Sequence, residues 1–284
     1  MSNFSTEFVK VTEPVPHVLL VELARAPVNA FNEAFWTQYG QVFDNISAST
    51  NDVRAIVLAS ALPKIFASGI DLTALDHINN LHPEPARRAF ELRSHVKAFQ
   101  NSIAAPERCP IPVIVAVNGP VYGLGVDIIS ACDVRYASSD ATFAIKEVDV
   151  GLAADIGSLA HLPKITGNTS LLRELALSAR TFSVVEAEKL GLVSKVVDGG
   201  RDAVVKEALS LAKLIASKSP VAVLGTKHLL MHARDHSVAE NMDYTVAWNA
   251  AMLQTGDLSA SFKALTAKPK RQPQYEGLKL PAKL

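Results

Sequence analysis

Runs of apolar residues alternate with amphipathic stretches through the first half of the chain, and this pattern predicts strands alternating with helices. Ala55–Ser60 and Pro112–Val117 are short, continuous apolar runs, which are typical of strands covered on both faces. The expected strands are Phe8–Val11, Val18–Leu23, Ala55–Ser60, Pro112–Val117 and Val134–Ala137, and the expected helices are Ala30–Ile46, Pro83–Ala105 and Gly123–Cys132. Because strands alternating with helices form βαβ-type units, we predict an α/β core.

From about Leu171 the pattern becomes almost entirely helical, with one strand-like segment at Leu192–Val197. The expected helices of this part are Leu171–Leu177, Val184–Leu190, Ala203–Ser217 and Pro220–Ala233, with further helix within Ser237–Thr266. These segments are too apolar to be left in solvent, so we expect them to cover the core or a partner subunit.

Composition and charge narrow the class of protein. The chain has 284 residues, of which 49% are hydrophobic, so it is long enough and apolar enough to bury a substantial core. Lys+Arg and Asp+Glu balance at 28 each, which gives no overall field to attract nucleic acid. Cys109 and Cys132 form neither a CxxC pair nor a metal-type cluster, and we expect two reduced, buried thiols. We expect no membrane span and no metal site.

The residues at the two ends of the sequence bear on where the protein is located in the cell. The N-terminal residues lack the basic and apolar regions of a secretory signal and the arginines of a mitochondrial transit peptide. The sequence closes on Ala282-Lys283-Leu284, which is similar to the Ser-Lys-Leu peroxisomal signal with Ala in place of Ser. We therefore expect an exposed tail that binds the peroxisomal import receptor, and a location in the peroxisomal matrix.

Three carboxylates stand in one apolar, glycine-punctuated stretch: Asp127, Glu147 and Asp155. Burying acids costs free energy unless each is hydrogen-bonded or neutral, and such costs often mark proton chemistry. The alternative for any one of them is a helix cap or a surface ion pair.

Two loops that follow expected strands look suited to presenting backbone N–H groups. They are Phe66–Leu72, after the strand at Ala55–Ser60, and Asn118–Gly125, after the strand at Pro112–Val117. In parallel sheets such loops line the ligand crevice, and two converging N–H donors would stabilise an enolate oxygen. The alternative is a pair of ordinary strand–loop–helix turns.

Together these motifs resemble the enoyl-coenzyme A hydratase/isomerase (crotonase) superfamily over nearly the whole chain. Arg25–Phe31 is similar to its first motif, Phe66–Leu72 to its first oxyanion loop and Asn118–Asp127 to its second. The resemblance implies a ββα spiral core over residues 1–200, a helical oligomerisation region over 201–268 that builds trimers or hexamers, and an exposed tail over 269–284. It implies that the oxyanion donors are the N–H groups of Ser68 and Leu124. Leu124 stands where the family usually has glycine, which requires a φ that leucine tolerates. The remaining implied substrate-binding residues are Gly69, Ile70, Asp71 and Leu72, although Asp71 is also a natural helix cap.

Within that superfamily, acids at all three positions resemble the dienoyl-coenzyme A isomerase branch, which moves a 3,5-diene to the conjugated 2,4-diene. The resemblance implies Asp155 as the base near C2, Glu147 as the acid near C6 and Asp127 as an orienting acid. Since C2 and C6 lie about 5 Å apart, two carboxyl groups serve the two ends better than one. Coenzyme A is then part of the substrate and no other cofactor is needed; Arg25, Lys64 and Lys263 are candidates for its phosphates.

Other functions remain open on the same scaffold. An enoyl-coenzyme A hydratase would use two acids to add one water across C2 and C3, and a 3-to-2 enoyl isomerase would need only one acid. A non-catalytic homologue would use the groove to bind acyl-coenzyme A, RNA or a partner protein.

Overall fold

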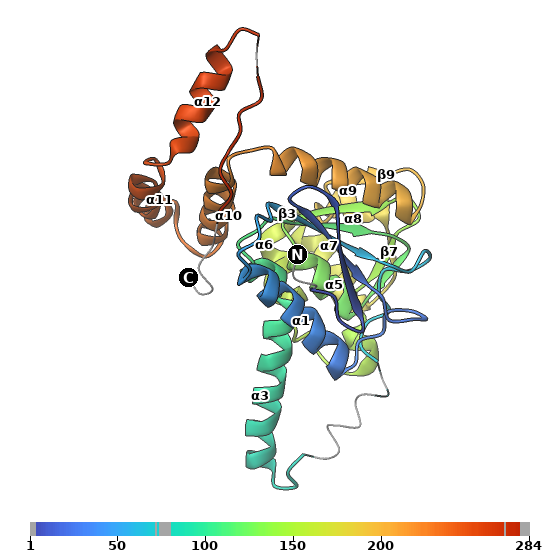
Figure 1. The fold of residues 1–284 in the computed structure, drawn as a ribbon. Coiled ribbons are helices and arrows are strands. Elements are labelled where there is room, and N and C mark those ends of the chain that lie inside the picture. Colours follow the sequence, from blue (N-terminus) through green and yellow to red (C-terminus); the bar gives the residue numbers. More distant parts are fainter. Residues whose placement is uncertain (1–3, 72, 74–80, 270, 279–284) are drawn as a thin grey trace.

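The computed structural model describes residues 4–71, 73, 81–269 and 271–278, and it is built on two sheets (Figure 1). The larger sheet has six strands, and all neighbours in it are parallel except the first two. Its order is β1 (Val9–Val15), β2 (Val18–Leu23), β3 (Ala55–Ser60), β4 (Val113–Val117), β6 (Val134–Ser138) and β9 (Lys195–Val197). The smaller sheet has the order β5 (Pro120–Tyr122), β7 (Thr142–Ala144) and β8 (Phe182–Ser183). The helices described next lie between these strands along the chain, so strands and helices alternate as predicted.

Helices cover the sheets, and the core consists of the side chains between them. The helices of the body are α1 (Glu33–Ser47), α3 (Pro85–Ile103), α4 (Ala105–Arg108), α5 (Leu124–Ser130), α6 (Ser158–Ile165), α7 (Thr169–Ser178), α8 (Val184–Leu190) and α9 (Arg201–Ala216). α1 begins after Asn32, whose side chain accepts a hydrogen bond from the N–H of Phe35. Its apolar face, which includes Phe35, Tyr39 and Phe43, is fully buried. Cys109 and Cys132 are free and buried, as expected.

The helix α9 belongs to the body, which corrects the expected division at residue 200. Val204, Val205, Ala208 and Ala212 of α9 are buried in one apolar cluster with residues of β2, β3 and β4. Small and β-branched residues on one face of the helix allow it to lie close against the sheet. The compact body therefore extends to the end of α9, and the helical extension begins after it.

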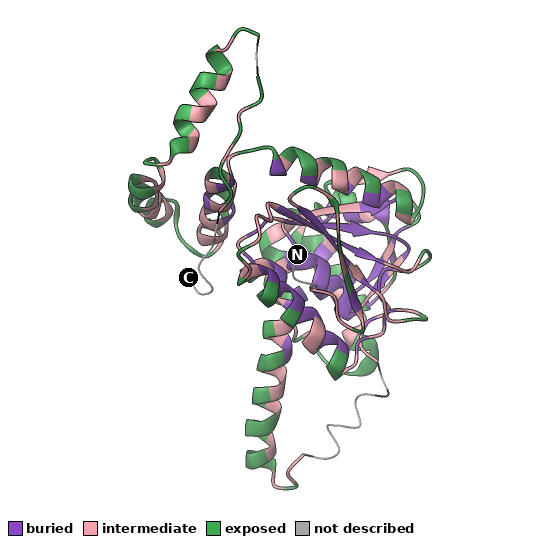
Figure 2. Cartoon of the chain, in the orientation of Figure 1, coloured by how far each residue is buried: buried purple, intermediate pink, exposed green. Residues whose placement is uncertain are grey.

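The extension consists of α10 (Pro220–Asp235), α11 (Val238–Met252) and α12 (Gly256–Thr266), which stand away from the body in Figure 1. Most residues of the extension are exposed to solvent or only partly buried (Figure 2). The exposed residues include large apolar ones: Val238 is 83% exposed and Leu265 is 70% exposed. Lys227 of α10 anchors the extension, because its buried Nζ donates to Asp133 Oδ2 at 2.7 Å.

The part of the chain that the structure describes has no single helix with the length and apolar composition to cross a bilayer. The consecutive helices α9 and α10 pass that test jointly, with a bend of 111° between them.

Candidate active site

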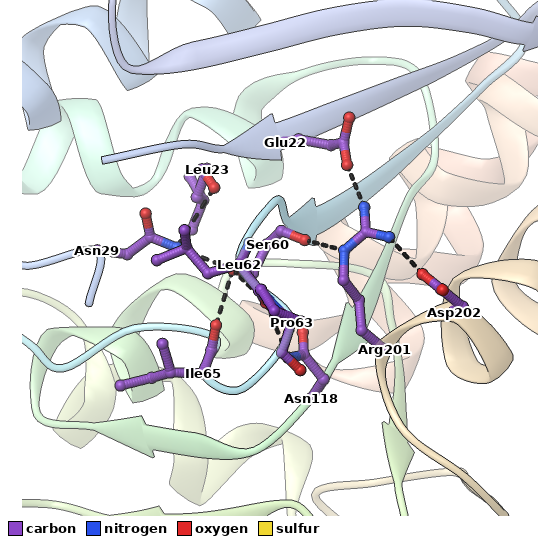
Figure 3. Close-up of polar contacts among 10 residues, drawn as sticks. All are labelled: Glu22, Leu23, Asn29, Ser60, Leu62, Pro63, Ile65, Asn118, Arg201 and Asp202. Atoms are coloured by element: carbon purple, nitrogen blue, oxygen red, sulfur yellow. Dashed lines mark hydrogen bonds and ion pairs between the residues drawn. The ribbon is translucent and has the colours of Figure 1, made fainter. Parts of the chain in front are cut away.

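Buried asparagines hold the loop that follows β3 against its neighbours (Figure 3). Asn29 Nδ2 donates to Ser60 Oγ and to the Phe66 carbonyl, each at 2.9 Å. From the other side, Asn118 Nδ2 donates to the carbonyls of Leu62 and Pro63 at 3.2 and 3.3 Å. These bonds satisfy buried carbonyls that an irregular loop would otherwise leave unpaired, so the loop is fixed before any ligand arrives.

Two glycines bring the loop after β3 and the loop after β4 into close approach. Gly69 has φ +97°, and a Cβ on it would lie 3.1 Å from the carbonyl oxygen of Tyr122 and 3.7 Å from the nitrogen of Leu124. Gly123 has φ +50°, and a Cβ on it would lie 3.9 Å from the Gly69 Cα. Both positions require the freedom of glycine, and they place the backbones of the two predicted oxyanion loops side by side.

The expected donor in the first loop is wrong, because the Ser68 N–H is already engaged. It donates to the Val28 carbonyl at 3.1 Å, and the Asp71 N–H donates to the Phe31 carbonyl at 2.9 Å. The N–H groups of Gly69 and Ile70 lie between these two and have no hydrogen-bond acceptor among the described residues. These are therefore the N–H groups of this loop that are available to a ligand.

The second expected donor, Leu124, is compatible with the structure. Leu124 is the first residue of α5, and the left-handed φ needed to enter the helix falls on Gly123 rather than on Leu124. The N–H of Leu124 lies at the N-terminus of the helix and has no acceptor among the described residues. The substitution of leucine for the usual glycine therefore imposes no backbone strain.

Asp127 is the buried acid of the site. It lies one turn into α5 and is 1% exposed, and its Oδ1 accepts from both the N–H and the Oγ of Ser158, each at 2.6 Å. Burial raises the pKa of Asp127 to about 7; the hydrogen bonds from Ser158 oppose this shift and the charge of Glu147 adds to it. Asp127 does not cap α5, because its carboxylate bonds across to α6.

Glu147 begins the short 3₁₀ helix η2 (Glu147–Val150) and faces the oxyanion loops. Its Oε1 lies 3.5 Å from the position that a Cβ of Gly123 would take, and its Oε2 is buried with no hydrogen-bond partner among the described residues. Burial raises the pKa of Glu147, and the negative charge of Asp155 raises it further. Both effects shift Glu147 toward its neutral form, in which it can donate a proton.

Asp155 lies in the extended segment between η2 and α6, and it is the exposed member of the trio. Its main-chain carbonyl accepts a 2.7 Å hydrogen bond from Gln100 Nε2 of α3, which fixes the backbone at this residue. The negative charge of Asp155 raises the pKa of Glu147, and the charge of Glu147 raises the pKa of Asp127. The three acids therefore form one electrostatically linked group. The sequence did not single out Ser158 or Gln100.

Of the three basic residues considered for binding the coenzyme A phosphates, Arg25 forms an ion pair within the chain, and Lys64 and Lys263 form none with a described residue. Arg25 forms an ion pair with Asp71 at 2.9 Å. Asp71 also accepts from Thr73 at its hydroxyl and N–H, and these bonds, with Arg25, lower the pKa of Asp71. Asp71 thus makes local hydrogen bonds to Thr73, and its expected role as a helix cap stays a prediction, because residues 74–80 lie outside the described residues. Lys64 and Lys263 are exposed, and neither makes an ion pair with a described residue. Leu72, also expected at the site, lies outside the described residues.

Comparison with known proteins agrees with this geometry. The family model described as enoyl-CoA hydratase/isomerase matches residues 15–278. A mouse (Mus musculus) protein named Delta(3,5)-Delta(2,4)-dienoyl-CoA isomerase, mitochondrial, is 46% identical over 271 residues, which are 94% of this chain and 82% of the mouse protein. A peroxisomal Arabidopsis thaliana protein of the same isomerase name is 41% identical over 254 residues, which are 88% of this chain and 89% of that protein. The crystal structure of an enoyl-CoA hydratase from Bacillus anthracis superposes with a TM-score of 0.84 at 26% identity, covering 96% of this chain and all of the other. The chain belongs to the enoyl-CoA hydratase/isomerase family and has its crotonase fold.

Proposed function

We propose that this protein converts 3,5-dienoyl-CoA to 2,4-dienoyl-CoA in the β-oxidation of unsaturated fatty acids. The observation that carries the proposal is the group of three linked carboxyl groups beside two loops whose backbone N–H groups, those of Ile70 and Leu124 among them, have no acceptor among the described residues. The mouse and Arabidopsis relatives with the isomerase name are 46% and 41% identical to this chain, which supports the same activity here. Coenzyme A is part of the substrate, and the proposed reaction uses no other cofactor.

In the first step, the thioester oxygen accepts hydrogen bonds from the N–H groups of Ile70 and Leu124. These donors stabilise the negative charge that develops on the oxygen when the C2 proton leaves. Ile70 replaces Ser68 in this role, because the Ser68 N–H is taken by Val28. The positive end of α5 adds to the same effect at Leu124.

Two carboxyl groups then move the protons. Asp155 in its ionised form takes the proton from C2, and the electron pair of that bond delocalises over the thioester and the diene. Glu147 in its neutral form gives its proton to C6, which leaves double bonds at C2 and C4. The exposure of Asp155 suits an ionised base, because water can hydrate its charge, and the burial of Glu147 suits a neutral acid.

Absorbance distinguishes this reaction from hydration. Purified protein mixed with a 3,5-dienoyl-CoA should produce a rise in near-ultraviolet absorbance as the double bonds become conjugated. Hydration of a 2-enoyl-CoA would instead lower the absorbance. If only the second change were observed, the protein would be a hydratase.

We also propose that the helical extension assembles the protein into a trimer or hexamer. The argument is the exposure of large apolar residues on α11 and α12, which an isolated chain would leave in water. Val246 is 70% exposed and Phe262 is 65% exposed. Sedimentation equilibrium should give three or six times the 30.4 kDa chain mass, and a monomer at micromolar concentration would contradict the proposal.

Finally, we propose that the protein resides in the peroxisome. The Arabidopsis relative is named as peroxisomal, whereas the mouse relative is named as mitochondrial. The residues Ala282-Lys283-Leu284, which lie outside the described residues, favour the peroxisome. A fluorescent protein fused to the N-terminus should appear in peroxisomes and should leave them when these three residues are deleted. Mitochondrial fluorescence would contradict the proposal.

A further inference from the structure

Both hydrogen-bond donors of Ser158, its N–H and its hydroxyl, donate to one oxygen atom of the buried Asp127 carboxylate. It is fully buried at the start of α6, and its N–H and Oγ each lie 2.6 Å from Asp127 Oδ1. Two donors to one carboxylate oxygen stabilise the ionised form of the carboxyl group much more than the neutral form. Ser158 therefore offsets part of the effect of burial on Asp127.

The charge of Asp127 matters because Glu147 is its electrostatic neighbour. Two carboxyl groups in a low-dielectric site do not readily ionise together, so over a range of pH the pair holds one proton between them. Burial favours the proton on Asp127, which is the more deeply buried of the two, and hydrogen bonds to the Asp127 carboxylate oppose this and favour the proton on Glu147. Asp127 has two donors from Ser158, whereas the buried Oε2 of Glu147 has no partner among the described residues.

Asp155 also favours the proton on Glu147, because its negative charge raises the pKa of Glu147, but the titratable groups near Asp127 on α6, α4 and α10 do not supply this bias. On α6, the ring of His161 lies 3.2 Å from the position that a Cβ of Gly157 would take, but burial lowers the pKa of His161 and so favours its neutral form. Its nearest charges are Glu107 of α4, at 3.7 Å, and Arg234 of α10, which forms an ion pair with Glu107. These two charges face each other rather than the carboxylate of Asp127.

We propose that Ser158 is a positioning residue for proton transfer: its two hydrogen bonds lower the proton affinity of Asp127 and thereby shift the shared proton toward Glu147, from which C6 is protonated. This inference rests on the proposed isomerase function. If the Ser158 hydroxyl is lost, Asp127 gains proton affinity and competes with Glu147 for the single proton. Glu147 is then ionised at a lower pH and can no longer act as the acid.

The test is the pH dependence of kcat for S158A on a 3,5-dienoyl-CoA. A hydrogen bond to a charged group changes an equilibrium by about tenfold to a hundredfold, so the alkaline limb of the profile should move to lower pH by about one unit. At pH 8 kcat should fall about tenfold, while KM stays within about twofold. S158T keeps the hydroxyl and should keep the alkaline limb at its wild-type position.

S130A is the matched control. The Ser130 hydroxyl donates to Asp127 as well, at 2.8 Å, but to the main-chain carbonyl rather than to the carboxylate. S130A should leave the alkaline limb in place. In a D127N background, in which there is no second carboxyl to take the proton, S158A should produce no further shift.

The inference is overturned if S158A lowers kcat equally at every pH, or if its profile matches the wild type. If S158A does not fold, S158C provides the test, because its thiol has a similar size and is a much weaker donor. S158C should move the alkaline limb in the same direction, and an unmoved limb would overturn the inference. Wild-type protein that does not convert the diene would refute the proposed function itself.

Discussion

Replacing Glu147 with glutamine should remove activity and at the same time stabilise the fold. The change keeps the size of the side chain but removes the proton that C6 must receive. General acid catalysis typically contributes 10²–10⁴-fold, so kcat for a 3,5-dienoyl-CoA should fall by about that factor in E147Q. The loss should appear in kcat, with little change in KM, because the substrate contacts remain.

The gain in stability follows from the raised pKa of Glu147. In the unfolded chain a glutamate ionises near a pKa of about 4.3, whereas burial raises the pKa in the folded protein. The folded state therefore binds more protons than the unfolded state above that value, and stability falls as the pH rises. Glutamine carries no charge, so E147Q removes the cost of ionising a partly buried carboxyl group, which we take as about 1 kcal/mol at pH 8.

Thermal unfolding and steady-state kinetics test both effects on one variant. At pH 8 the Tm of E147Q should exceed that of the wild type by about 2–4 °C, and the difference should vanish near pH 4. E188Q is the control, because Glu188 is exposed on α8 and should leave both kcat and Tm unchanged. An E147Q enzyme with kcat within tenfold of the wild type would refute the assignment of Glu147 as the acid. A lower Tm at pH 8 would refute the account of its burial.

Three further substitutions test other parts of the account. D155N should lower kcat about 10²–10⁴-fold and abolish exchange of the C2 proton with deuterated solvent, which NMR measures; persistent exchange would assign the base elsewhere. G69A places a Cβ 3.1 Å from the Tyr122 carbonyl at φ +97°, so it should cost about 1–3 kcal/mol in urea unfolding, and an unchanged midpoint would contradict the close approach of the two loops. K227A removes the 2.7 Å ion pair of Asp133, which keeps its hydrogen bond from the N–H of Val113, and should destabilise the protein by about 3–5 kcal/mol in the same assay, whereas a loss under 1 kcal/mol would show that this pair does not anchor α10.

The elements with a clear hydrophobic period were predictable from the sequence. The continuous apolar run at Ala55–Ser60 is β3, and the amphipathic stretch at Val184–Leu190 is α8, both with the predicted bounds. The smaller sheet was not predicted, because strands of two or three residues are too short to show a period. α6 was also missed; it follows Gly157 and contains Pro163, both of which interrupt a helical pattern.

The candidate site was predictable in its acids but not in its hydrogen bonds. Asp127, Glu147 and Asp155 stand out in an apolar stretch, and the structure links them. The donor in the first loop was mistaken, because the sequence does not show that Val28 already occupies the N–H of Ser68. Ser158 was missed for a similar reason, since its partner lies 31 residues away in the chain and the contact exists only in the folded protein.

The central claim is that one carboxyl group removes a proton from C2 and another delivers a different proton to C6, and one experiment in deuterated water tests it most directly. The protein is incubated with a 3,5-dienoyl-CoA in D₂O, and the product is analysed by NMR. The account predicts a 2,4-dienoyl-CoA with new deuterium at C6. A product hydroxylated at C3, or a 2,4-dienoyl-CoA without deuterium at C6, would contradict it.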